Sequence, residues 1–118
     1  MTDIDVAEEN KRRFLDAFGR FAAGDVEVLR EIIREDFVSH SPGAPAGRDP
    51  WIEFIVASPI AGARLDIRHV IADAEFVVAH YDLIPAGAPA EVVIDIWRFE
   101  DGLIVEHWDA SRPLERGR

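Results

Sequence analysis

Residues 92–111 read VVIDIWRFEDGLIVEHWDAS, and this segment decides the fold. Two apolar runs flank the sequence Glu-Asp-Gly, which is typical of a β-hairpin. We expect a three-residue loop, in which a type I turn is followed by Gly102 in the left-handed conformation. The alternative is a two-residue loop of Asp101 and Gly102. It would pair residues that face opposite sides of the sheet, so the longer loop is preferred.

Three ionisable residues, Asp95, His107 and Asp109, interrupt these apolar runs. The longer loop places Asp95 opposite His107. Because side chains alternate along a strand, all three then share one face with Trp97 and Phe99. The other face carries Val92, Ile94, Ile96, Ile104 and Trp108. An ionised carboxylate in a dry core costs several kcal/mol unless it is paired. We therefore expect the first face to line a cavity and the second to meet another subunit.

Helical patterns precede the hairpin. An apolar stripe with steps of three and four residues predicts a helix over residues 5–23. Asp25 is placed to cap a second helix, whose apolar side extends to Ile33. The Asp-Pro pair at 49–50 predicts the start of a third helix over residues 51–57. Residues 37–40 read as a short apolar exit into a Pro/Gly loop.

From Ala63 the period changes to two, which is typical of strands. Residues 65–71 and 76–83 predict two strands, and the hairpin adds two more after a Pro/Gly/Ala loop. Helices followed by a four-stranded meander favour an α+β domain with the helices on one face of an antiparallel sheet. A chain of 118 residues is expected to form a single domain, residues 1–118.

Composition excludes several classes of function. Thirteen basic and 23 acidic residues give a net charge of −10, which argues against binding to nucleic acid or an anionic membrane. The absence of cysteine excludes disulfides, thiolate metal sites and a Cys nucleophile. No compact His spacing predicts a metal site, and we expect neither metal nor cofactor. The acidic, polar N-terminal sequence is unlike a secretion signal, so the expected location is cytoplasmic.

Three segments carry a family resemblance: FVSHSPGAP (37–45), VIADAEFVVAHYD (70–82) and DIWRFEDGLIVEHWD (95–109). They resemble the SnoaL-like polyketide cyclase branch of the NTF2-like superfamily. The resemblance implies an α+β cone, in which a curved antiparallel sheet packs on three N-terminal helices around an internal pocket. It also implies a homodimer through the outer face of the sheet.

The resemblance assigns roles to residues. In the family's cyclases, a carboxylate near the end of the last strand is the acid/base of an intramolecular aldol ring closure, and no metal or cofactor is used. By position this residue matches Asp109, while His40 matches a pocket histidine and Asp95 a polar residue on the preceding strand. We expect Asp95 to orient the imidazole of His107, and His40 to donate a hydrogen bond to a substrate carbonyl. Residues expected to contact the substrate are Trp51, Phe54, His80, Tyr81, Asp82, Trp97 and Phe99.

Three functions stay open at this point. The first is a cofactor-free SnoaL-like enzyme that performs aldol-type cyclisation or isomerisation of a small, mainly apolar carbonyl compound. The second is a non-catalytic module for ligand binding or dimerisation on the same fold. The third is hydrolysis of the kind performed by limonene epoxide hydrolase-like proteins, with water activated between Asp82 and Asp109. His80 stands where those proteins have an arginine. The sequence does not decide between an enzyme and a binding module.

Overall fold

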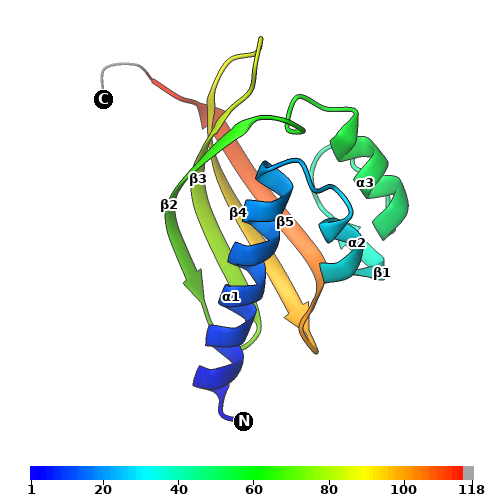
Figure 1. Cartoon of the computed structure of the whole chain (residues 1–118), viewed down its shortest axis with the longest axis vertical. Coiled ribbons are helices and arrows are strands. Elements are labelled where there is room, and N and C mark those ends of the chain that lie inside the picture. Colours follow the sequence, from blue (N-terminus) through cyan, green and yellow to red (C-terminus); the bar gives the residue numbers. More distant parts are fainter. Residues whose placement is uncertain (116–118) are drawn as a thin grey trace.

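The computed structural model describes residues 1–115. Three helices pack on one face of a five-stranded sheet, whose strand order is β1-β5-β4-β3-β2 (Figure 1). In chain order the elements are α1 (Asp3–Ala22), α2 (Val28–Ile32), β1 (Ile33–Ser39), α3 (Arg48–Val56), β2 (Arg64–Ala72), β3 (Phe76–Ile84), β4 (Glu91–Glu100) and β5 (Leu103–Pro113). The sheet is curved and does not close, and the predicted α+β class is confirmed.

Helix α1 is the long helix that the apolar stripe predicts, and it begins two residues earlier than expected. The Thr2 hydroxyl accepts the backbone N–H of Asp5, and the Asp5 carboxylate accepts the backbone N–H of Thr2, so the first turn is capped from both sides. Phe14 is buried beneath the helix, while Phe18 and Phe21 lie farther along the same stripe and are only partly buried. The end of α1 therefore presents aromatic rings to the interior.

The expected second helix is too long, and one strand was not predicted. Helix α2 has only five residues, and its N-cap is Glu27, which makes no side-chain cap. Asp25 instead accepts two hydrogen bonds from Arg20, of 3.0 and 2.8 Å. Strand β1 follows at Ile33 and pairs in parallel with β5. The predicted exit at residues 37–40 thus belongs largely to a fifth strand, whose partner lies about 70 residues away in the sequence.

The hairpin has the shorter of the two loops considered above. Asp101 (φ 50°) and Gly102 (φ 78°) form the turn, and Glu100 pairs with Leu103. Two successive residues with positive φ are typical of a type I′ turn, which suits the twist of the strands. The preference for a three-residue loop was therefore wrong, as was the register that placed Asp95 opposite His107. Asp95 pairs with Asp109 instead.

A β-bulge explains why the predicted facing of the ionisable residues survives the wrong register. Phe99 pairs with Ile104 and Arg98 with Glu106, so Val105 is an extra residue on β5. The bulge reverses the facing of the residues before it relative to those after it. Ile104 therefore points into the core, contrary to the prediction.

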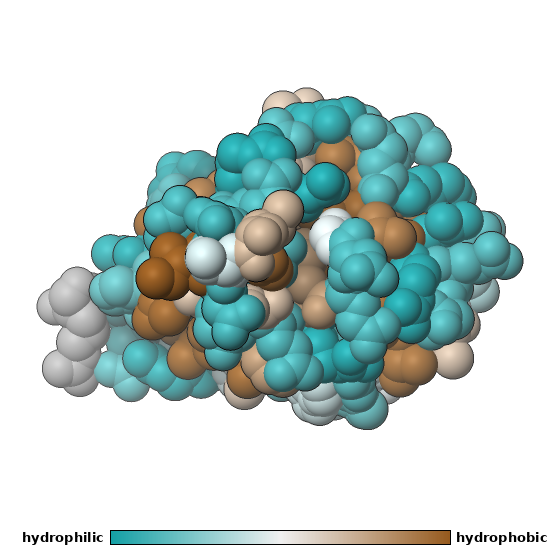
Figure 2. All heavy atoms as spheres, turned by 90° about the horizontal axis from the view of Figure 1, so that it is seen from below, coloured by the Kyte–Doolittle hydropathy of each residue, from teal (hydrophilic) through white to brown (hydrophobic). Residues whose placement is uncertain are grey.

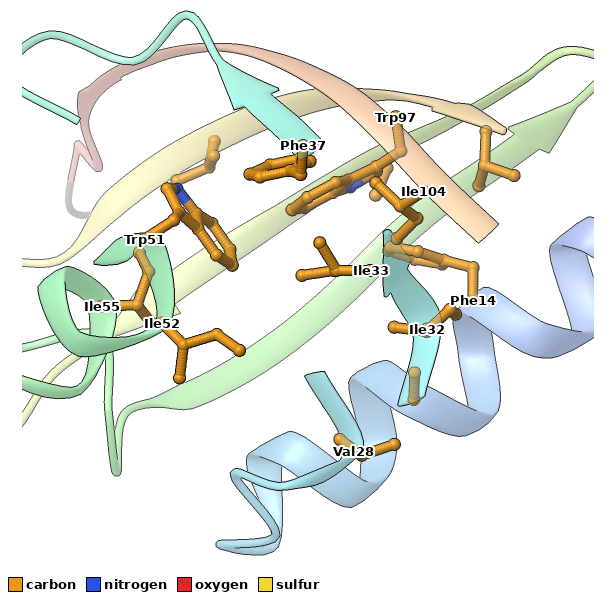
Figure 3. Close-up of a cluster of buried hydrophobic side chains, with 14 of the residues drawn as sticks. Phe14, Val28, Ile32, Ile33, Phe37, Trp51, Ile52, Ile55, Trp97 and Ile104 are labelled. Carbon is orange, nitrogen blue, oxygen red and sulfur yellow. The ribbon is translucent and has the colours of Figure 1, made fainter. Parts of the chain in front are cut away.

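The core lies between the helices and the inner face of the sheet. Figure 3 shows Phe37 of β1 lying between Trp51 of α3 and Trp97 of β4, with Ile33 beneath them. The rings of Phe37 and Trp51 meet edge to face, with centroids 5.1 Å apart. Helix α3 begins three residues earlier than predicted, after Gly47. It buries Trp51, Ile52 and Ile55, whereas Phe54 is 39% exposed.

No helix within residues 1–115 combines the length and the apolar composition that a bilayer span requires. Viewed from below, the surface is mainly hydrophilic, with hydrophobic patches between the polar side chains (Figure 2).

Candidate active site

Three strands contribute to a buried polar network on the inner face of the sheet. Asp95 of β4 accepts a hydrogen bond from the Tyr81 hydroxyl at 2.7 Å through Oδ2, and its Oδ1 lies 2.9 Å from Nε2 of His107 on β5. Asp95 and His107 are each only 3% exposed. Both carboxylate oxygens are thus engaged, which offsets the cost of burying the charge.

Tyr81 is held in its neutral form. Burial raises the pKa of Tyr81 well above its usual value of 10.0, and the charge of Asp95 and the hydrogen bond to it add to the increase. The phenol therefore keeps its proton at neutral pH and donates a hydrogen bond to Asp95.

The imidazole of His107 is fixed from several sides. Its ring stacks on Trp97, with centroids 3.9 Å apart and an interplanar angle of 22°. Trp51 approaches edge to face at 6.2 Å. The second ring nitrogen, Nδ1, lies 3.1 Å from the hydroxyl oxygen of Ser39 on β1. Both nitrogens of His107 therefore have partners within the protein.

A cavity of about 280 Å³ opens beside this network. Its lining is largely aromatic and aliphatic and includes Phe18 and Phe21 of α1, Trp51 and Phe54 of α3, and Trp97. The polar lining residues are Ser41, Tyr81, Asp95, His107 and Asp109. A mainly apolar wall with a few convergent polar groups is typical of sites for small organic molecules. Among the described residues no lysine or arginine lines the cavity.

Asp109 differs from the other polar groups of the cavity. It pairs with Asp95 across the two strands and lines the cavity, but it is exposed. Its carboxylate has no hydrogen-bond or ion-pair partner within residues 1–115. The inner face thus combines a satisfied buried pair with a free carboxylate, and the free one is available to a ligand.

Within residues 1–115, Asp95, His107 and Asp109 form the group of side chains that could hold a metal ion. One nitrogen or oxygen atom from the side chain of each of Asp95, His107 and Asp109 lies within 4.8 Å of the others. However, Nε2 of His107 is bonded to Asp95 and Nδ1 to Ser39, so the imidazole has no free nitrogen to offer. The geometry is that of a hydrogen-bond network.

Some predicted site residues do not reach the cavity. His40 lies on the outer face of the sheet, where its Nε2 is 2.7 Å from Glu106 and its ring stacks on Trp108 with centroids 5.1 Å apart. His80 is also on the outer face and stacks on His69, with the two Nδ1 atoms 3.0 Å apart. Phe99 is 3% exposed and belongs to the core behind the cavity.

Asp82 and Asp109 lie on opposite faces of the sheet. Tyr81 points inward, and its neighbour Asp82 therefore points outward, where it forms a salt bridge with Arg68. Asp82 is nevertheless only 4% exposed. The structure does not bring these two carboxylates together around one water molecule.

Ser39 and Ser41 are the site residues that sequence reasoning missed. Ser39 is paired in parallel with His107, and the backbone N–H of His40 donates to the carbonyl of His107 at 2.8 Å. A strand prediction for residues 33–39 would have placed Ser39 on the same face as Phe37. The sequence Phe37-Val38-Ser39 does not alternate in polarity, so the burial of Phe37 and Ser39 around exposed Val38 is seen only in the structure.

Comparisons with known proteins agree with this architecture. Residues 12–107 match the model of the SnoaL-like domain family. An NTF2-like protein of unknown function from Burkholderia xenovorans superposes with a TM-score of 0.81 at 17% identity, covering 94% of this chain and 88% of that one. A proposed ketosteroid isomerase from Kribbella flavida gives a TM-score of 0.80 at 17% identity, covering 95% and 84%.

A third solved structure is similar in length to this chain. IdmH, a proposed polyketide cyclase from Streptomyces antibioticus, gives a TM-score of 0.68 at 24% identity and covers 86% of this chain and 91% of its own. Likeness at these identities concerns the fold, which is NTF2-like. Among curated proteins, none matches this sequence.

Proposed function

The chain belongs to the SnoaL-like domain family, and on this premise we propose that it is a cofactor-free enzyme that performs acid/base chemistry on a small, mainly apolar carbonyl compound. The observation that carries the proposal is the free carboxylate of Asp109 at a largely apolar cavity, beside a buried network that already satisfies Asp95 and His107. A base must be accessible to its substrate, and of the two cavity carboxylates Asp109 is the accessible one.

The proposed reaction begins with proton abstraction. Asp109 takes a proton from the carbon next to a substrate carbonyl, and the resulting enolate is stabilised by hydrogen bonds to its oxygen. In a cyclisation, the enolate carbon attacks a second carbonyl of the same molecule, and the new alkoxide takes the proton back from Asp109. In an isomerisation, the proton returns to a different carbon. The proton balance closes in both cases.

In this proposal the candidate donors to the enolate oxygen are the Ser41 hydroxyl and the indole N–H groups of two residues of the lining, Trp51 and Trp97. The imidazole of His107 also lines the cavity, but both of its nitrogens already have partners within the protein, so it is not counted as a donor. The indole N–H groups of Trp51 and Trp97 are buried and have no hydrogen-bond partner within residues 1–115. Because the lining contains carboxylates and, among the described residues, no lysine or arginine, we expect a substrate that carries no negative charge.

A binding module is the second candidate, and one observation favours it. Asp95, His107 and Tyr81 satisfy one another without a ligand, as a purely structural network would. The epoxide hydrolase alternative receives no such support, because Asp82 lies on the outer face and Asp109 lines the cavity.

The experiment that separates the two candidates does not require the natural substrate. The protein is incubated in D₂O with a panel of small apolar ketones, diketones and keto-esters, and the α-proton signals are followed by NMR. We expect exchange faster than in buffer for at least one compound, unaffected by a metal chelator. Saturable binding without exchange would instead identify a binding module. The control for Asp109→Asn, the variant of the proposed base, is Asp101→Asn. Asp101 is a turn residue with positive φ, a conformation that asparagine tolerates.

We also propose a homodimer through the outer face of the sheet. Ile71, Ile94 and Ile96 are exposed there by 65%, 46% and 36%, which is an unusual density of apolar side chains for solvent. Sedimentation velocity tests this proposal. Ile94→Lys is expected to shift a dimer to monomer, whereas a wild-type protein that is monomeric at high concentration would contradict it.

A further inference from the structure

We propose that Ser39 is a positioning residue whose hydroxyl turns between two hydrogen bonds, so that the buried imidazole of His107 is satisfied both with and without its second proton. The inference deepens the proposed function, because it concerns the same site. Its geometry is nevertheless testable without a substrate.

The argument begins with the donors and acceptors around Ser39. Its Oγ lies 3.1 Å from Nδ1 of His107, accepts the backbone N–H of Ser41 at 3.3 Å, and lies 3.1 Å from the Ser41 hydroxyl. A hydroxyl offers one donor and two acceptor sites. Ser39 thus has three partners, and only one of them can receive its proton.

Two arrangements satisfy these groups. When His107 is neutral and carries its proton on Nε2 toward Asp95, its Nδ1 accepts the Ser39 hydroxyl. When His107 is protonated, Nδ1 donates to Ser39, whose lone pairs then accept from both His107 and the Ser41 backbone. The Ser39 proton turns to the Ser41 oxygen. A rotation about one C–O bond connects the two states.

Because the site is buried, a hydroxyl that satisfies His107 in both protonation states matters for stability. Ser39 is 8% exposed and His107 3%, so water does not readily replace a missing partner. The charged or titratable groups that face the imidazole are Asp95 of β4, Tyr81 of β3 through its bond to Asp95, and Asp109 of β5. Ser39 of β1 and Trp51 of α3 contribute no charge.

The link to catalysis is electrostatic. One side-chain nitrogen or oxygen atom of each of Asp109, His107 and Asp95 lies within 4.8 Å of the other two. A proton that arrives on or leaves Asp109 therefore changes the charge next to the imidazole. An imidazole that is satisfied in both protonation states can respond to this change without breaking the network.

Two-dimensional ¹H–¹⁵N NMR of the histidine rings tests the inference on the free protein. In the neutral form of wild-type His107 we expect the ring proton on Nε2, toward Asp95. In Ser39→Ala the imidazolium loses its Nδ1 acceptor, and the midpoint should fall by about 1 pH unit, because hydrogen bonds from a charged donor are the stronger ones. Ser41→Ala removes only the acceptor for the turned hydroxyl, so a smaller fall is expected. Ser39→Thr, which keeps the hydroxyl, should restore the wild-type midpoint.

Ser58→Ala is the matched control, because the Ser58 hydroxyl bonds to the carbonyl of Ile55 and does not touch the site. A folded Ser39→Ala variant with an unchanged midpoint and tautomer would overturn the inference. If that variant does not fold, Ser39→Cys takes its place with the same expected direction and the same contradicting result. All of these readings are independent of turnover, so their failure is distinct from a failure of the proposed function.

Discussion

The two faces of the sheet use the same strands to build two different hydrogen-bonded networks. On the inner face, Asp95 and His107 are each 3% exposed and depend on each other and on Tyr81. On the outer face, Glu106, the immediate neighbour of His107, bonds His40 at 2.7 Å and Arg98 at 2.9 Å. Asp95 and Glu106 each have two side-chain partners, but Asp95 is buried and Glu106 is partly exposed.

The difference teaches that solvent access decides what such a network contributes. The outer side chains of His40 and Glu106 are 44% and 24% exposed, so water can replace a lost partner. Exposed ion pairs contribute little, whereas a buried group that loses its partner is left uncompensated. The inner network is therefore strongly coupled, and the outer network should tolerate substitution.

The largest expected effect is that of Asp95→Ala. It leaves the imidazole of His107 and the hydroxyl of Tyr81 buried without their partner, and the free energy of unfolding should fall by about 3–5 kcal/mol. The matched change on the outer face, Glu106→Ala, should cost about 1 kcal/mol or less. Urea denaturation measures both. Equal losses from the two variants would remove the distinction between the faces.

A smaller effect is expected for Tyr81→Phe, which removes one hydrogen bond to a buried charge. The loss of unfolding free energy should be about 1.5–3 kcal/mol. Urea denaturation again measures it, and a loss within the error of the Glu106 variant would contradict the account.

The same tyrosine predicts a specific alkaline behaviour. Because its pKa in the folded protein is raised above the unfolded value of 10.0, its contribution to stability is fully present below pH 10 and is lost as the pH rises further. Tyr81 is the one tyrosine of the chain, so any phenolate absorbance that appears as the pH rises comes from this residue. We expect phenolate to form only together with unfolding, seen by circular dichroism. Phenolate formation near pH 10 in a folded protein would be inconsistent with this burial.

The smallest expected effect lies on the outer face at low pH. Hydrogen bonds to His40, and then to Arg98, lower the pKa of Glu106 below its usual 4.5. A lowered pKa contributes stability above the unfolded value and loses it as the pH falls through the folded value. Wild type should therefore exceed Glu106→Gln slightly at pH 7 and match it in more acidic solution. A difference in urea midpoint that grows on acidification would have the wrong sign.

The facing of Asp95, His107 and Asp109 was predictable because strands alternate and charged groups are rare in apolar runs. The register was not, because it depends on a two-residue turn and on the bulge at Val105, whose effects on facing cancel. Strand β1 was also beyond local pattern, since its parallel partner is β5. The place of Ser39 in the site follows from that pairing, and so does the place of His40 on the outer face.

The central claim is that Asp109 is the free base of the cavity and that the buried network only supports it. Its most direct test is the rate of α-proton exchange in Asp109→Asn, measured with a compound that wild type exchanges, together with the affinity for that compound. The account predicts a loss of at least about 100-fold in exchange rate with little change in affinity. An exchange rate in Asp109→Asn equal to that of wild type would contradict it.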